Sequence, residues 1–175
     1  WIGFIVLAVM MGVSSWIAIR PIKQERRRSF LLALATIGVC GTAMLFLVCK
    51  GVLMLHPWYQ PQVTIPLAGM IYSNCMNMVS LSGERYEKER GHGLSYAEAR
   101  GAAFNAALIP QINTFLAVGL VSLPGMMTGQ ILSGVSPLIA VRYQIMVMCM
   151  ILGSGGLAAA GYLQLKKVPE LDPAR

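Results

Sequence analysis

Few residue types that could do chemistry occur in this 175-residue chain, and most of them lie in apolar surroundings. The twelve Met and four Cys residues carry soft sulfur atoms. Met126-Met127, and Met146, Met148 and Met150 with Cys149, could ligate a metal ion. Methionine is equally an adaptable packing residue, and the cysteines show no CxxC spacing, so we favour packing. Whether any sulfur binds metal stays open. These cysteines are Cys40, Cys49, Cys75 and Cys149.

The carboxylates and histidines do not form a recognisable active site. Proton- or sodium-coupled carriers usually keep a carboxylate inside the membrane, whereas all seven acids here lie outside the apolar segments. His56 and His92 have no acid partner that the sequence places beside them. No G-x-x-x-x-G-K-[ST] phosphate loop occurs, so this chain is not expected to bind ATP in that way. The acids are Glu25, Glu84, Glu87, Glu89, Glu98, Glu170 and Asp172.

The composition predicts an all-α integral membrane protein. Hydrophobic residues make up 56% and charged residues 12%, with a mean hydropathy of +0.63, whereas a soluble domain carries about 25% charged residues. The net charge of +7 could suggest nucleic acid, but the basic residues flank apolar segments, so we expect lipid and no nucleic acid. Because the chain begins with Trp1 in an apolar run, we expect an N-terminally truncated fragment with an open number of missing spans.

Charge-free segments predict about five transmembrane helices in a single transmembrane domain, approximately at 1–19, 29–50, 63–82, 111–133 and 143–165. The uncharged run 101–141 is counted as one crossing, because two would place Lys166 and Lys167 outside. The C-terminus is then expected in the cytoplasm. The membrane is expected to be the plasma membrane, which is the inner membrane if the source is bacterial. All Lys and Arg residues except Lys50 and Arg142 fall on the cytoplasmic side.

The polar segment 83–109 predicts a cytoplasmic loop with a helix of its own. The charged residues 84–90 extend the third span into water, and Gly91 and Gly93 break it. Ser95 and Glu98 have the spacing of a capping box, in which each side chain satisfies a backbone N–H of the other residue. We therefore expect a helix from Tyr96 towards Ile109, before Pro110.

The fourth span is interrupted by helix breakers at mid-depth. Pro124, Gly125 and Gly129 lie in LVSLPGMMTGQILSGVSP (120–137), where a freed carbonyl must be satisfied by protein or by a water-lined cavity. Transporters often place their pathway at such breaks, but a kinked packing helix is about as common. Gly125/Gly129 and Gly155/Ala159 are also small-xxx-small pairs that allow close helix packing.

Three polar residues elsewhere are further pathway candidates. Asn74 and Asn77 lie within the third span and are the polar groups there that are candidates to face the pathway. Arg142 lies close to the start of the last span, where it either extends to the outer interface or lines an outer vestibule.

Two long segments resemble a known family. IPLAGMIYSNCMNMVSL (65–81) and LVSLPGMMTGQILSGVSPLIAVRYQIMVM (120–148) look like the iron-export ABC transporter permeases, which include bacterial Fet-type permeases and plant aluminium-sensitivity permeases. The resemblance implies a transport subunit that is not itself an enzyme and carries no cofactor. ATP and magnesium would bind a separate cytosolic ATPase, and two permease subunits would pair. Iron or another metal would be the exported cargo.

The segment GLSYAEARGAAFNAALIP (93–110) is similar to the cytoplasmic coupling segment of ABC permeases. Glu98, Ala99, Gly101 and Pro110 match its EA…G…P spacing, and Arg100 replaces the usual second alanine. We expect the ATPase to move the helix that starts after Ser95 and to pass this motion through Pro110.

The motion would reach the broken span, and the expected pathway residues are Pro124, Gly125, Met126, Met127 and Gly129. Two alternatives from other classes stay open. One is a secondary carrier or channel that works without ATP, and the other is a non-transporting membrane scaffold.

Overall fold

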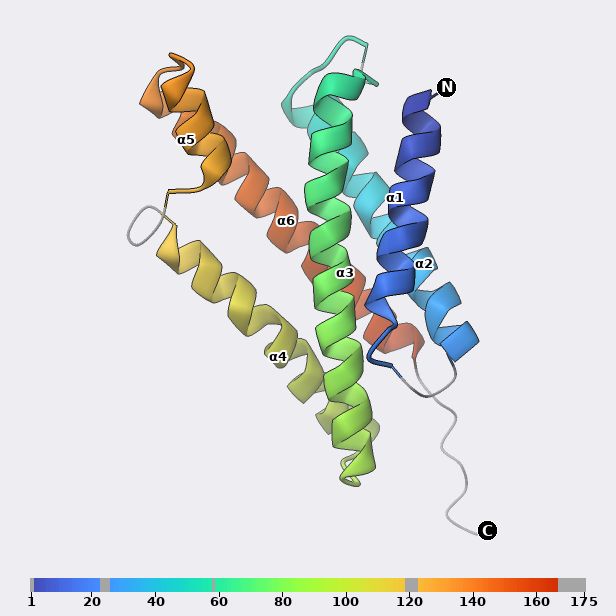
Figure 1. The fold of residues 1–175 in the computed structure, drawn as a ribbon. Helices are drawn as coiled ribbons and strands as arrows, with labels where there is room; N and C mark the ends of the chain where they lie inside the picture. The colour runs from blue at the N-terminus through green and yellow to red at the C-terminus, as the bar shows by residue number, and fades with distance from the viewer. Residues whose placement is uncertain (1, 23–25, 58, 119–122, 167–175) are drawn as a thin grey trace.

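The computed structural model describes residues 2–22, 26–57, 59–118 and 123–166, and its regular elements are all helical (Figure 1). The predicted all-α class is therefore confirmed. The elements are α1 (Ile2–Ala18), α2 (Arg26–Phe46), the π-helical turn η1 (Leu47–Val52), α3 (Pro61–Gly91), α4 (Tyr96–Ala117), α5 (Gly125–Leu132) and α6 (Pro137–Leu165).

Successive long helices run in alternating directions (Figure 1). The end of α1, the start of α2, the α3–α4 turn and the end of α6 lie at one end of the bundle, in the lower part of Figure 1. The start of α1, the end of η1, the start of α3 and the α5–α6 turn lie at the other end. α4 and α5 run in the same direction as two pieces of one broken path. Five passes through a membrane would need this order of directions, although the number of passes stays a prediction.

By length and mean hydropathy, two segments of the described chain qualify as membrane spans. They are Arg26–Val52, which joins α2 to η1, and Pro137–Leu165, which is α6. Gly3–Ala18 is a shorter apolar helix. Many large apolar side chains on these helices are exposed, including Val9 and Trp16 of α1 and Val39 of α2, as expected of surfaces that face lipid rather than water.

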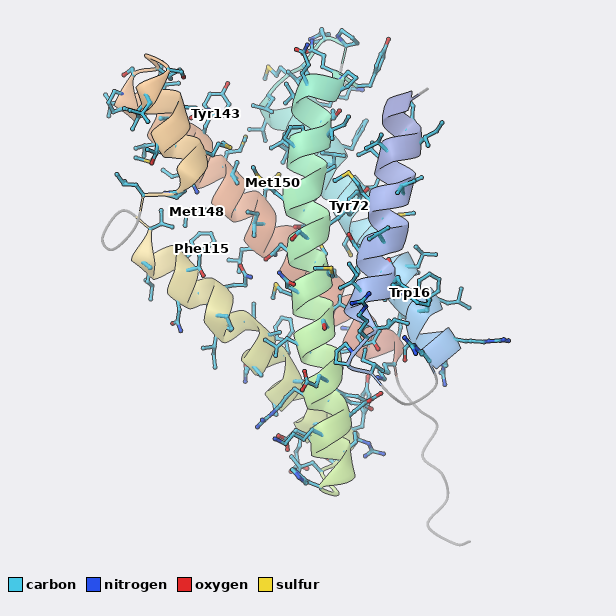
Figure 2. All side chains as sticks on the ribbon, in the orientation of Figure 1. Trp16, Tyr72, Phe115, Tyr143, Met148 and Met150 are labelled. Atoms are coloured by element: carbon cyan, nitrogen blue, oxygen red, sulfur yellow. The ribbon has the colours of Figure 1, made fainter. Side chains whose placement is uncertain are left out.

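α3 is the central helix, and its buried face supplies much of the core. Ile71 and Val79 are fully buried on it, and Tyr72 in its upper half (Figure 2) donates or accepts a 3.1 Å hydrogen bond with Thr42 of α2. α1, α2, α4 and α6 all pack against α3. A Cβ atom at Gly83 would overlap the Ile22 side chain. This glycine therefore lets the segment before α2 pack directly on α3.

One predicted boundary next to a proline was wrong. α4 does not end before Pro110 but continues to Ala117, and Pro66 likewise lies inside α3. A proline removes one helical hydrogen bond and bends a helix without necessarily ending it. Pro110 is exposed, and Thr114 donates a 2.8 Å hydrogen bond to its carbonyl.

The last helix begins earlier than predicted, and the third one ends as predicted. α6 starts at Pro137, which occupies the first turn of the helix. Arg142 therefore lies inside α6 rather than before it. α3 extends as a single helix to Gly91, and the chain then turns at Gly93, whose φ of +85° favours glycine.

The predicted span 111–133 is not one helix. Its first part belongs to α4, which ends at Ala117, and its last part forms α5, which has only 8 residues. Of the expected break, Leu123 and Pro124 are described, whereas residues 119–122 lie outside the described residues.

Candidate coupling helix and transport segment

The start of α4 has the predicted capping box. The Ser95 backbone N–H donates to Glu98 Oε2 at 3.1 Å, and the Glu98 N–H donates to Ser95 Oγ at 3.4 Å. The Ser95 hydroxyl also donates to Glu98 Oε2 at 2.7 Å. These bonds stabilise the carboxylate form, so they lower the pKa of Glu98 below its ordinary value. The first turn of α4 is thus fixed by its own side chains.

The other predicted coupling residues divide between a buried and an exposed face. Ala99 is completely buried, whereas Arg100 and Gly101 are exposed. The Arg100 guanidinium lies 5.6 Å from the centroid of the Tyr96 ring, which orients the charge away from the core. Pro110 lies further along α4, so it is connected to this group only through the helix.

Tyr96 makes a contact that sequence reasoning missed. Its hydroxyl donates to the backbone carbonyl of Leu163 at 3.0 Å, near the end of α6. The last carbonyls of a helix lack intrahelical partners, so a nearby hydroxyl is a natural donor to them. The sequence shows a tyrosine directly after the capping serine, which is a signal that this residue could make a specific contact. It does not show the partner, because Leu163 is 67 residues away along the chain.

A hollow of about 270 Å³ lies between α4 and α6, next to this contact. Arg100 and Gln164, both exposed, contribute to its polar lining. Its apolar lining comes from Phe104, Ala160 and Leu163. The exposed coupling residues therefore border a recess that could receive a side chain of another protein.

α5 contains the predicted pathway residues at the opposite end of the molecule from the capping box (Figure 1). Pro124 is its N-cap residue, and its carbonyl accepts bonds from the N–H and hydroxyl of Thr128 at 3.0 and 3.2 Å. A Cβ added at Gly125 or Gly129 would meet nothing within 4 Å. This pair therefore provides no close helix packing within the described chain.

The two methionines of α5 differ from its glycines. Met126 and Met127 are half-buried, and Met126 packs against the main apolar core. Gln130, on the same short helix, has a buried side-chain oxygen with no hydrogen-bond partner in the described part of the chain. α5 is thus a small helix whose one side packs on the bundle and whose glycine side is open.

Asn74 has a partner that gives it a packing role. Its amide donates to the carbonyl of Ile151 on α6 at 2.8 Å, and the side chain is buried. A Cβ at Gly155 would clash with this amide and with Met78 Sδ, so the predicted close packing at Gly155/Ala159 is confirmed against α3. Asn77 is exposed on α3.

Arg142 is exposed in the first part of α6, near Tyr143 at the upper left of Figure 2. Figure 2 also shows Phe115 near the end of α4 and Met148 and Met150 further along α6. The predicted pathway residues therefore fall into separate groups: those of α5, Asn74 at the α3–α6 contact, and the exposed Asn77 and Arg142.

Charged residues in the described chain gather at the end that carries the capping box. The acids Glu84, Glu87, Glu89 and Glu98 all lie on the last turns of α3 or the first turn of α4. The described residues contain no group of three or more His, Cys, Asp or Glu side chains that could hold a metal ion.

Comparison with known proteins supports a family assignment. The sequence matches UPF0014, described as an uncharacterised protein family, over residues 1–168. The chain belongs to this family. No solved structure matches the chain.

UPF0014 relatives include bacterial and plant proteins. A UPF0014 membrane protein of Synechocystis is 36% identical over 167 residues, which cover 87% of this chain and 64% of the relative. The probable iron export permease protein FetB of Escherichia coli is 39% identical over 124 residues, covering 61% and 48%. Protein ALUMINUM SENSITIVE 3 of Arabidopsis thaliana is 30% identical over 174 residues, covering 90% and 62%. The chain thus spans about half to two thirds of these relatives' length. The predicted resemblance is confirmed, and apolar helices and relatives together indicate a membrane location.

Proposed function

We propose that this UPF0014 chain is the membrane permease subunit of an ATP-driven exporter whose ATPase is a separate cytosolic protein. The single observation that carries the proposal is α4. It begins with a rigid, capped and charged first turn and continues without interruption through Pro110 to the break before α5. A force applied to the exposed Glu98 and Arg100 can therefore reach the broken segment through one helix.

The proposed topology has five passes through the plasma membrane with the capped turn in the cytoplasm. The end of α1, the start of α2 and the ends of α3 and α6 share this end (Figure 1), and most of the basic residues of the described chain lie there. Excess Lys and Arg on short loops marks the cytoplasmic side. The opposite end has Lys50 and Arg142. In a bacterium this membrane is the inner membrane, and the C-terminus is cytoplasmic.

The proposed pathway lies at α5. Neither α5 alone nor the part of α4 beyond Pro110 is long enough to cross a bilayer, which needs about 20 helical residues. Together they form one interrupted crossing. The open faces of Gly125 and Gly129 then have room for a second permease subunit, so we include a homodimer in the proposal.

Iron or another metal is the proposed cargo. The support comes from FetB, which is named a probable iron export permease, and from the plant relative, whose name refers to aluminium sensitivity. ATP is the proposed energy source because the acids of the described chain lie at the end of α3 and the start of α4, rather than inside apolar helices where ion-coupled carriers keep them.

Association with an ATPase tests this proposal. The full-length protein, purified from its own cells in mild detergent, should carry an ATP-binding protein with it. Arg100→Glu reverses an exposed charge while leaving the Ser95–Glu98 cap intact, so it should reduce the co-purified ATPase about tenfold. Glu84→Arg, an equally exposed reversal on α3, is the control and should retain it. Absence of any ATP-binding protein from the wild-type complex would contradict the proposal.

A further inference from the structure

Lys166 joins the ends of α3 and α6 through a largely buried ion pair. Its Nζ donates to Glu87 Oε1 at 2.9 Å, and the two side chains are only 9% and 15% exposed. Lysine is rarely buried, because its ammonium group is strongly hydrated in water. The end of α6 therefore does not hold a freely solvated charge but one that is enclosed by protein.

Two tyrosines enclose the same ammonium group. Lys166 Nζ lies 5.7 Å from the centroid of the Tyr86 ring and 5.4 Å from that of the Tyr162 ring, within the range in which a ring face attracts a cation. Both tyrosine hydroxyls are buried and have no hydrogen-bond partner among the described residues, and burial raises the pKa of Tyr86. The ion pair is thus enclosed by closely packed aromatic side chains.

The coupling helix joins this cluster through Tyr96. The rings of Tyr96 and Tyr86 meet edge to face, with centroids 6.2 Å apart, and the Tyr96 hydroxyl bonds the carbonyl of Leu163 at 3.0 Å. The first turn of α4, the last turns of α3 and the end of α6 are therefore tied at one place.

α6 connects this place with α5. It is one uninterrupted helix of 29 residues, which at 1.5 Å per residue spans about 40 Å. α5 packs against its far part, as the upper left of Figure 1 shows. A displacement at the end of α6 is therefore carried to α5 by a rigid element, in parallel with the route along α4.

We propose that Lys166, Glu87, Tyr86 and Tyr162 form a latch that fixes the end of α6 to the end of α3, and that Tyr96 ties the start of α4 to it. The latch makes the ends of α3, α4 and α6 move as one body, so that motion of α4 also reaches α5 through α6. Its residues are positioning residues. Their role in coupling rests on the proposed function, whereas the existence of the latch does not depend on that function. Removal of either charge takes away the ion pair that joins the ends of α3 and α6, so single substitutions should open the latch.

Amide hydrogen exchange of the full-length protein in lipid nanodiscs tests the latch without any assay of transport. Lys166→Gln should accelerate exchange in peptides covering the end of α6 and the first turns of α4 about tenfold or more. Lys166→Arg keeps the charge, and the exchanged pair Glu87→Lys with Lys166→Glu restores it, so both should stay within about threefold of the wild type. Lys88→Gln, an exposed neighbour on α3, is the matched control. Equal exchange in Lys166→Gln and Lys88→Gln would overturn the latch.

Its role in coupling is tested in proteoliposomes that contain the full-length protein and its ATPase. In Lys166→Gln, ATP hydrolysis should persist while Fe²⁺ moved per ATP falls about tenfold, and the exchanged pair should recover part of the loss. Unchanged Fe²⁺ transport per ATP in Lys166→Gln would refute the coupling role. If the wild type itself shows no ATP-driven Fe²⁺ transport, the proposed function fails, and the exchange experiment still decides whether the latch exists.

Discussion

At the scale of single residues, the contact between α3 and α6 depends on an asparagine and a glycine that fit each other. Asn74 reaches the Ile151 carbonyl only because Gly155 leaves the space beside it empty. The sequence predicted the small-residue pair Gly155/Ala159, since its spacing is visible in one helix. It did not predict that Asn74 would be the partner, because a contact between residues far apart in sequence depends on the relative rotation of two helices.

Substitution of neighbouring glycines tests this contact. Gly155→Ala should destabilise the protein by about 1–3 kcal/mol, because the new methyl group overlaps the Asn74 amide and Met78 sulfur. Gly156→Ala meets open space and should be neutral or stabilise by up to about 1 kcal/mol, since alanine favours the helix. Thermal unfolding in detergent measures both. Equal stability of the two variants would contradict the packing account.

The charges of the latch show where residue-level prediction stops. Lys166 was counted from sequence as one of the basic residues that mark the cytoplasmic side. Its burial against Glu87, Tyr86 and Tyr162 depends on three helix ends meeting, and no pattern within one segment records this.

At the scale of elements, α4 is the clearest case of a helix whose start was predictable and whose end was not. The capping box is a local signal, so Ser95 and Glu98 placed the first turn correctly. Pro110 was taken as a terminator, but in an exposed position its missing hydrogen bond is tolerated. The consequence is functional, because a continuous α4 can transmit force that two separate helices could not.

The capping box gives a pH dependence to the first turn of α4. Folding lowers the pKa of Glu98, mainly through the Ser95 hydroxyl. The stabilisation is therefore complete above the carboxyl's unfolded pKa and is lost as pH falls through the lower folded value. Amide exchange in the first turns of α4, taken relative to Glu98→Gln at each pH, should show protection near neutrality that disappears in acid. A constant ratio between the two proteins from neutral to acidic pH would argue against the cap.

α5 is expected to tolerate large side chains in its fold but not in its activity. A Cβ at Gly125 or Gly129 has no atom of the described chain within 4 Å, so the protein that carries Gly125→Leu with Gly129→Leu should insert and purify normally. Export should nevertheless be abolished, because the leucines fill the open face assigned to the pathway and the second subunit. Gly12→Leu, another open glycine on α1, is the control and should retain export. Metal efflux at the wild-type rate in the double variant would remove α5 from the pathway.

At the scale of the whole molecule, the sequence predicted the class and the order of the helices because both follow from local composition. Apolar runs and charge clusters are read segment by segment, and they led to an all-α protein with an interrupted fourth crossing. Figure 1 shows that α4 diverges from α3 along its length and that α5 packs against α6. Neither arrangement was predictable, because both arise from packing between segments that are separate in the sequence. The family assignment adds a transport context through its relatives, whose lengths exceed that of this chain.

The most direct measurement is ATP-driven metal transport by the full-length protein reconstituted into liposomes with its ATPase. Mg-ATP supplied on the side of the capped α4 turn should drive Fe²⁺ across the bilayer against its gradient, and Fe²⁺ should stimulate ATP hydrolysis more than other divalent cations do. Both effects should vanish without the ATPase. Transport of Fe²⁺ at the same rate in the absence of ATP or of the ATPase would contradict the account and indicate a carrier or channel instead.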